Sequence, residues 1–201
     1  MQVNGLRGLL TEYGEVMGKG RAALDKAMPG VIETLTDHLP AMLIDSLREQ
    51  WNGLADLDRQ IAEIERRLRH WMKEDKACKA VAEIPGVGLL TATAAVATMG
   101  DPKSFRSGRE FAACIGIVPR QTGTGGKVQL GGISKRGDTY LRTLLIHGAR
   151  SVLAHAKEPG PWVEQISKRR PPNVVTVALA NKMARTIWAV LAHDRPYEKG
   201  T

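Results

Sequence analysis

Apolar residues between positions 41 and 79 recur with the seven-residue spacing of a coiled coil. The first heptad position holds Leu47, Leu54, Ile61 and Leu68, and the fourth holds Gln50, Leu57, Ile64 and Trp71. Because Gln50 is the single polar residue in this set, the pattern predicts a long helix with an apolar stripe. The stripe would either pair with another helix or pack against its own domain, and both alternatives stay open.

The first 40 residues have a less regular helical pattern. They predict two short helical stretches on either side of a glycine-rich turn. Pro29 and Gly30 are expected to break the second stretch, and Pro40 precedes the long helix.

From residue 80 onward, apolar runs rich in alanine and leucine alternate with turns. One helix is expected to end near Ile84, and a tight turn over 85–88 leads into a helix that reaches Met99. The spacing of Ser107 and Glu110 is that of a capping box, which predicts a helix over 108–115.

Two further helices complete the pattern. In the helix that follows residue 138, Leu141 and Leu145 are expected to face inward, whereas Arg142 and Arg150 face outward. Asn173 is expected to cap the last helix. The sequence shows no convincing strand longer than about four residues.

These patterns predict an all-α protein. Residues 1–40 form a helical linker segment, residues 41–79 a long coiled-coil-like extension, and residues 80–201 a compact helical domain. The compact domain is expected to hold a helix-hairpin-helix-like segment and a glycine-rich basic loop.

Positive charge is concentrated in the second part of the chain. Residues 1–79 contain 12 Lys or Arg and 13 Asp or Glu, a net charge of −1. Residues 80–201 contain 17 and 8, a net charge of +9. This asymmetry is typical of a domain that binds nucleic acid, although a passive basic surface would look the same.

Cysteine content and hydropathy define the expected compartment. Cys78 and Cys114 are isolated from each other and from clustered histidines, so no zinc site is predicted and a reducing cytosol suits them. The sequence shows neither a signal peptide nor an apolar run of about 18 residues. We therefore expect a soluble cytoplasmic protein that makes no membrane contact.

The segment Pro119–Asp138 is glycine-rich and basic. Arg120, Lys127, Lys135 and Arg136 are predicted to contact phosphates, together with Arg142 in the next helix. The six glycines of the segment would allow the main chain to lie against a nucleic-acid strand. A surface loop of no functional consequence is the alternative.

A nucleotide-binding P-loop is excluded for this segment. Gly126 and Lys127 supply the Gly-Lys pair, but the pattern also needs glycine at position 121 and a hydroxyl residue at position 128. Those positions hold Gln121 and Val128.

Hydroxyl groups in the same segment are candidate nucleophiles. Thr122, Thr124 and Ser134 all lie in a cationic setting, but a hydroxyl needs a base, a metal or neighbouring cations to activate it. Composition does not choose among the three.

The turn at 85–88 offers a second candidate contact with nucleic acid. Gly86 and Gly88 would let backbone N–H groups at the start of the following helix approach a phosphate, as in a helix-hairpin-helix. A turn that only packs two helices would have the same pattern.

Three quoted stretches carry a resemblance to a known family. "EIPGVGLLTATAAVATMGD", "FAACIGIVPRQTGTGGKVQLGGISKRGDTYLRTLLIHGARSVL" and "VALANKMARTIWAVL" occur here in the order found in insertion-sequence transposases of the IS110 group. The chain resembles the C-terminal half of that group, in particular of its IS1111 subgroup. The match is dense over residues 80–195, and the heptad region and the opening "QVNGLRGLLTEYG" also fit the family.

The resemblance implies a mechanism for this chain. Members of the family join a RuvC-like domain, with four metal-binding carboxylates, to a domain of this kind, and recombine DNA under the guidance of an RNA from the element. By position, the family's nucleophilic serine falls on Thr124, a departure that keeps the hydroxyl and adds a methyl group. Mg²⁺ is implied through the carboxylate domain, which this sequence does not show, so no cofactor is expected on this chain alone.

The resemblance leaves three functional readings open. The chain would bind DNA and guide RNA as the strand-exchange portion of a transposase, here expected to be a truncated copy unable to exchange strands alone. It would otherwise be a non-catalytic module whose coiled coil pairs with itself or with full-length transposase. An inert remnant that merely folds is the third reading.

Overall fold

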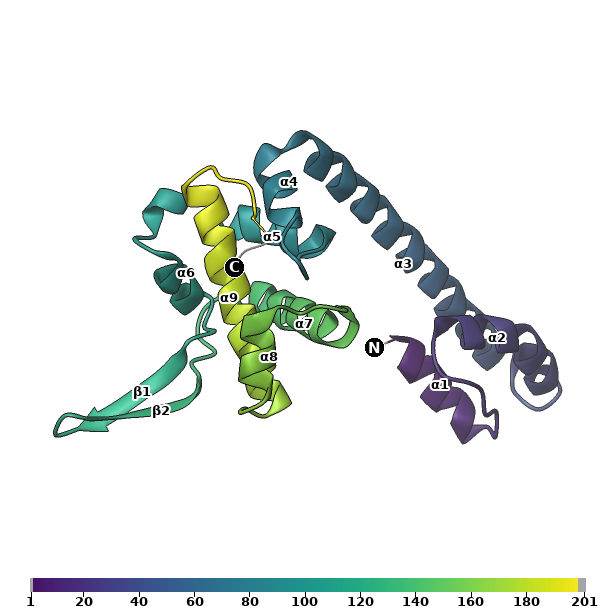
Figure 1. The fold of residues 1–201 in the computed structure, drawn as a ribbon. Coiled ribbons are helices and arrows are strands. Elements are labelled where there is room, and N and C mark those ends of the chain that lie inside the picture. Colours follow the sequence, from purple (N-terminus) through teal and green to yellow (C-terminus); the bar gives the residue numbers. More distant parts are fainter. Residues whose placement is uncertain (1, 199–201) are drawn as a thin grey trace. The chain divides into compact units, whose positions relative to one another are not determined.

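The computed structural model describes residues 2–198 and divides the chain into two compact units, residues 1–66 and 67–201 (Figure 1). Each unit has its own hydrophobic core. The described residues are mainly helical, as the sequence predicts, with one small antiparallel sheet that was not expected.

The first unit is built from α1 (Gln2–Glu12), α2 (Arg21–Thr36) and the first part of α3 (Ala41–Glu74). Its buried residues come from all three helices: Leu6, Leu10, Leu24, Met28, Val31, Ile32, Leu35, Ile44, Leu47 and Leu54. The Trp51 indole N–H donates to the Asp25 carboxylate at 2.7 Å and ties α3 to α2.

The expected break at Pro29 and Gly30 is wrong. Helix α2 continues through Pro29, although an internal proline disfavours a helix by about 3 kcal/mol. Met28, Val31 and Ile32, which flank the proline, are buried in the core of the first unit. Their burial offsets the lost backbone bond, so tertiary packing overrides the local signal.

The heptad stripe on α3 has two different environments. Leu47 and Leu54 are buried against α1 and α2 in the first unit. Leu57, Ile61 and Ile64, further along the same stripe, are exposed. The long helix is therefore confirmed, and its first turns pack on their own unit, while the later turns present apolar side chains to solvent.

The second unit contains the remaining elements. In chain order they are α4 (Lys76–Ala82), α5 (Leu89–Met99), a 3-10 turn (Pro102–Ser104), α6 (Gly108–Cys114), β1 (Pro119–Thr124), β2 (Lys127–Ile133), α7 (Thr139–His155), α8 (Pro161–Ser167) and α9 (Pro172–Ala192). Helix α9 is central, because α4, α6, α7 and α8 all pack against it (Figure 1).

Helix α9 is apolar because it lies in this core. Its buried residues are Val175, Thr176, Leu179, Ala180, Met183, Ala184, Ile187 and Val190. Among the described residues 2–198, α9 is also long and apolar enough to count as a candidate membrane span, and 44% of its apolar window is buried, as in a core helix. The N-cap residue is Pro171 rather than the predicted Asn173, because α9 already begins at Pro172.

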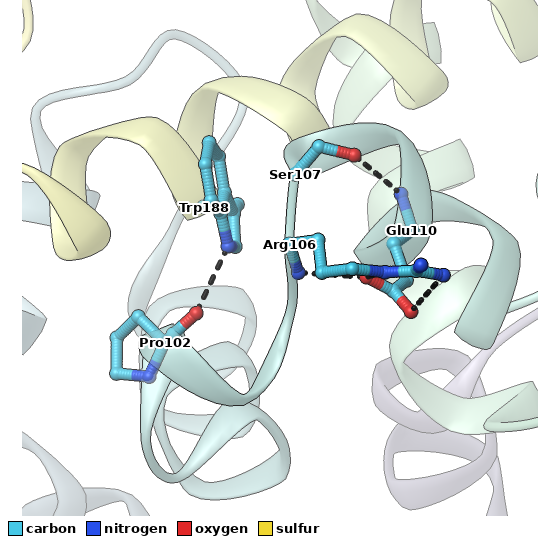
Figure 2. A network of polar contacts seen from close by, with 5 residues as sticks. All are labelled: Pro102, Arg106, Ser107, Glu110 and Trp188. Carbon is cyan, nitrogen blue, oxygen red and sulfur yellow. Dashed lines mark hydrogen bonds and ion pairs between the residues drawn. The ribbon is translucent and has the colours of Figure 1, made fainter.

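The predicted cap at the start of α6 is present as a variant of the capping box, in which the Glu110 carboxylate accepts from the N–H of Arg106 rather than from that of the N-cap residue Ser107 (Figure 2). The Ser107 hydroxyl accepts from the Glu110 N–H at 3.3 Å, and the Glu110 carboxylate accepts from the Arg106 N–H at 2.7 Å. The Arg106 guanidinium also lies on this carboxylate, at 3.3 Å. Nearby, the Trp188 indole N–H donates to the Pro102 carbonyl at 3.0 Å and fastens the 3-10 turn to α9.

The capping box makes stability depend on pH. Hydrogen bonds from Arg106 hold the pKa of Glu110 below its ordinary value of 4.5, so the folded state favours the carboxylate. This contribution is complete above the unfolded pKa and is lost as pH falls through the folded pKa. We expect Glu110→Gln to lower the melting temperature slightly at neutral pH. The difference in melting temperature between the wild type and this variant should shrink below about pH 4. Thermal melts of both proteins between pH 3 and 7 measure it, and a difference that grows on acidification would contradict the assignment.

Candidate nucleic-acid interface

The glycine-rich segment is a β-hairpin, not a flexible loop. Strands β1 and β2 pair antiparallel, with Thr124 opposite Lys127 and Thr122 opposite Gln129. Gly125 and Gly126 form the two-residue turn, with φ angles of 60° and 78°. Two positive φ angles define a type I′ hairpin turn, and glycine adopts them without strain. The expectation of no strand longer than about four residues is wrong.

The sequence contained one signal for this hairpin. A Gly-Gly pair between two runs of strand length is a hairpin turn signal, and "GTGGKV" has it. This signal was weak because the strands are mostly polar residues and glycine, with only three large apolar residues, Val128, Leu130 and Ile133, so the usual apolar alternation is incomplete.

The two faces of the hairpin differ in character. Cross-strand partners point to the same side of a sheet, so Thr122, Thr124, Lys127 and Gln129 share one face. Val128 and Leu130 lie on the other face and are 65% and 67% exposed. Both strands are exposed along almost their whole length, so the hairpin projects from the helices of the second unit (Figure 1).

The three candidate hydroxyls fall at two separate places. Thr124 lies next to the turn, and Thr122 lies on the same face about 7 Å along the strand. Ser134 lies at the other end of the hairpin, where its N–H donates to the Val118 carbonyl at 2.8 Å. Six residues separate Thr124 from Val118, or about 20 Å of strand. Ser134 is therefore not part of the tip.

The root of the hairpin is held by close backbone packing. Besides the Ser134 bond, the Lys135 N–H donates to the Gly116 carbonyl at 3.1 Å, with Lys135 itself at a φ of 55°. A Cβ at Gly116 would overlap the Arg136 carbonyl oxygen, and a Cβ at Gly137 would overlap the Cys114 carbonyl oxygen. Both glycines also have positive φ angles, so no other residue fits without movement of the main chain.

Arg142 has a different position from the predicted one. It is only 7% exposed, and its guanidinium donates to the carbonyls of Ile115 and Arg136 at 3.0 and 3.2 Å and to the Thr139 hydroxyl at 3.0 Å. The outward orientation is thus wrong. A buried guanidinium needs acceptors, and the two backbone segments at the hairpin root supply them. Arg142 is therefore not placed to contact a phosphate, and it clamps the root of the hairpin instead.

Replacement of Arg142 tests this clamp. Arg142→Met keeps most of the apolar stem but leaves two backbone carbonyls without their donor, so we expect the free energy of unfolding to fall by about 2 kcal/mol. Arg150→Met, on the exposed side of the same helix, is the matched control and should change it by less than about 0.5 kcal/mol. Urea unfolding followed by circular dichroism compares the two, and equal losses would argue against a clamp.

The other four predicted cations are exposed. Arg120 lies at a register irregularity between Pro119 and Gln121, Lys127 follows the turn, and Lys135 and Arg136 lie in the segment that leaves β2. The sequence has no acidic residue from position 111 to 137. The first carboxylate after the hairpin, Asp138, caps α7 by accepting from the Leu141 N–H at 3.0 Å and also accepts from the Thr98 hydroxyl at 3.1 Å.

The turn between α4 and α5 is present as predicted, and its two glycines differ in how closely they are packed. Gly86 has a φ of 83°, and a Cβ there would lie 2.7 Å from the Gly148 carbonyl oxygen of α7. Gly86 thus permits tight packing of the turn on α7. Gly88 is exposed and is the N-cap of α5, with no side chain capping the first turn. Of the two, Gly88 is the position with backbone open to a ligand.

Metal binding and the reactivity of Cys78 both bear on how the hydroxyls could be activated. Among residues 2–198, no three His, Cys, Asp or Glu side chains gather closely enough to hold a metal ion. The described residues therefore do not fit Mg²⁺. Burial raises the pKa of the Cys78 thiol to about 12, which keeps it protonated and unreactive.

Comparison with known proteins gives the class of the chain. Residues 78–162 match the model of the "Transposase IS116/IS110/IS902 family". A Pseudomonas aeruginosa protein described as "Probable family 20 transposase" is 44% identical over 98% of this chain and 60% of its own length. The transposase for insertion sequence element IS1111A of Coxiella burnetii is 40% identical over 98% of this chain and 56% of its own length.

A third relative extends the same match. The transposase for insertion sequence element IS1328 of Yersinia enterocolitica is 38% identical over 98% of this chain and 59% of its own length. All three relatives are described as transposases, two of them as transposases of named insertion sequence elements. The chain belongs to the IS116/IS110/IS902 family of transposases, which confirms the resemblance seen in the sequence. It spans less than two thirds of the length of these relatives.

Proposed function

We propose that this chain is the nucleic-acid-binding, strand-exchange portion of an insertion-sequence transposase, acting on DNA in the cytoplasm with an RNA of the element as guide. The observation that carries the proposal is the exposed hairpin with its exit segment, which holds four exposed cations and no acidic side chain. Such a surface binds a polyanion through its phosphates.

The structure of the hairpin supports this use. Its root is fastened by Arg142 and by the two close-packed glycines, whereas its strands bury almost no apolar surface. A two-stranded hairpin alone is marginally stable in water, so binding to a strand would add the stabilisation that the hairpin lacks. The wider unit, residues 67–201, has 22 Lys or Arg against 10 Asp or Glu, which favours the same partner.

Salt dependence tests the binding proposal. We expect the affinity of the purified chain for duplex DNA and for RNA to fall linearly on a plot of log affinity against log salt concentration, because phosphate contacts release counterions. The measurement is fluorescence anisotropy of a labelled strand at several salt concentrations. Affinity that does not respond to salt would rule out phosphate binding by these cations.

Thr124 is the proposed nucleophile. It lies at the exposed tip on the same face as Lys127, which would hold a phosphate near its hydroxyl. A threonine hydroxyl is weak without activation, and the described residues offer no carboxylate cluster, so the proposal assigns metal activation by Mg²⁺ to carboxylates outside this set. This division agrees with what the family resemblance implies.

A covalent adduct tests Thr124. This chain, supplied with Mg²⁺, labelled element DNA, the element's RNA and a longer family member, is expected to form an adduct that resists detergent. Its 21.9 kDa mass separates it from the longer protein on a gel. Thr124→Ser should keep the adduct and Thr124→Val should abolish it. Thr122→Val is the matched control on the same face and should retain it; loss with Thr122→Val alone would move the role to Thr122.

A second function is supported by the exposed part of the heptad stripe. Leu57, Ile61 and Ile64 are large apolar side chains on one stripe of α3, and a coiled coil would cover them. On this proposal the chain is a non-catalytic module that assembles with itself or with full-length transposase. Inhibition of recombination by a longer relative when this chain is added, and its relief by Ile61→Glu, would favour this function over direct strand exchange.

A further inference from the structure

A groove beside the hairpin root has no role in the binding described so far. Its volume is about 710 Å³, which is within the usual range for ligand sites. Helix α9 forms most of its wall, α8 contributes Trp162, and the rest comes from Ile117 and from Pro119 and Ile133, the paired end residues of the two strands. The groove therefore begins where the hairpin ends.

The wall of the groove combines apolar surface with positive charge. Trp162 and Val174 are large apolar residues on it, and Trp162 is 37% exposed. Lys182 and Arg185 line the same groove, which has no acidic lining residue. The Lys182 ammonium lies 4.9 Å from the centroid of the Trp162 ring, so a cation and an aromatic face stand together.

The side-chain amide of Asn181 in the wall can form hydrogen bonds with the edge of a nucleobase. Asn181 lines the groove, and its amide donates one hydrogen to the Ile117 carbonyl at 3.4 Å. A side-chain amide has a second N–H and an acceptor oxygen, which are the groups that pair with the edge of a nucleobase.

We infer that this groove binds one unpaired nucleotide of a nucleic-acid strand. In the bound state Lys182 leaves the Trp162 ring for the adjoining phosphate, which Arg185 also neutralises, and the base stacks on the ring in its place. An apolar protein side chain would fill the space but would leave both cations without a counter-charge, so a nucleotide fits the whole wall better. The inference rests on the proposed nucleic-acid function and adds a site that contacts a base, whereas the hairpin cations contact the backbone.

The test compares strands with and without bases. Single-stranded DNA and RNA of equal length are each prepared in an ordinary form and in a form whose central nucleotides are abasic, and binding is measured by anisotropy. The wild-type chain should prefer the ordinary form, and Trp162→Ala should weaken binding of that form about tenfold while leaving the abasic form within about twofold. Trp162→Phe should restore most of the affinity, because phenylalanine also stacks.

The controls separate this inference from the proposed function. Arg120→Ala should weaken both forms equally, because it removes a phosphate contact. Val174→Ala, at an exposed position on the groove wall, is a second variant with little risk to folding and should show a smaller loss confined to the ordinary form. Equal loss on both forms, or no loss, with Trp162→Ala would overturn the groove assignment and leave hairpin binding intact. Absence of binding by the wild-type chain would overturn both.

Discussion

Replacing Gly137 with alanine is expected to destabilise the second unit by about 4 kcal/mol. The added methyl group would overlap the Cys114 carbonyl oxygen, which belongs to the main chain and cannot rotate away. Gly137 also has a φ of 79°, a conformation that disfavours any residue with a Cβ. Because this contact joins the exit of the hairpin to the end of α6, the hairpin root should open. Urea unfolding monitored by circular dichroism measures the loss.

Gly132→Ala is the matched control for this prediction. Gly132 lies in β2 of the same hairpin, but a Cβ there would meet no atom within 4 Å, and its φ is not in the left-handed region. We expect this change to leave the free energy of unfolding within about 0.5 kcal/mol of the wild type. If Gly137→Ala were equally mild, the close approach of the two backbone segments would not be essential to the root.

Removing Arg120 and Lys127 together is expected to weaken nucleic-acid binding about 50-fold at moderate salt. Both side chains are exposed on the hairpin, and each is proposed to neutralise one phosphate. For duplex DNA the slope of log affinity against log salt concentration should therefore become shallower by about 2. The double alanine variant is titrated with labelled duplex at several salt concentrations to obtain both quantities.

A second double variant controls for charge alone. Lys103 and Lys157 are exposed lysines outside the hairpin, so their replacement by alanine removes the same net charge. We expect a small loss of affinity and an unchanged slope. If both double variants behaved alike, binding would reflect the overall positive charge of the unit rather than contacts on the hairpin.

The sequence predicted most of the helices because their signals are local. The capping box at Ser107 and the turn after Ile84 depend on residues a few positions apart, and both are present in the structure. Pro29 and Asn173 show where local signals failed. Pro29 remains inside α2 because its neighbours are buried. Asn173 is not the cap of α9 because that helix already begins one residue earlier, at Pro172.

The candidate interface was predictable only in part. The sequence singled out the basic segment and its hydroxyls from composition, since charge and glycine content need no knowledge of the fold. The hairpin was not expected, because its strands lack the apolar alternation that marks a half-buried strand. The outward orientation predicted for Arg142 was wrong for a related reason. Helical periodicity tells which face of the helix a residue lies on, but it does not tell which backbone carbonyls pack against that face.

The sequence by itself determined the family, the mainly helical composition and the concentration of positive charge in the second part of the chain, because these depend on residue identity and short-range spacing. The tertiary structure alone decided that Thr122 and Thr124 share a face with Lys127, and that Ser134 lies at the root. It also decided that Arg142 is buried and that Trp162, Lys182 and the ends of the hairpin border one groove. These facts rest on contacts between residues far apart in the chain, which only the packing of helices and strands can bring together.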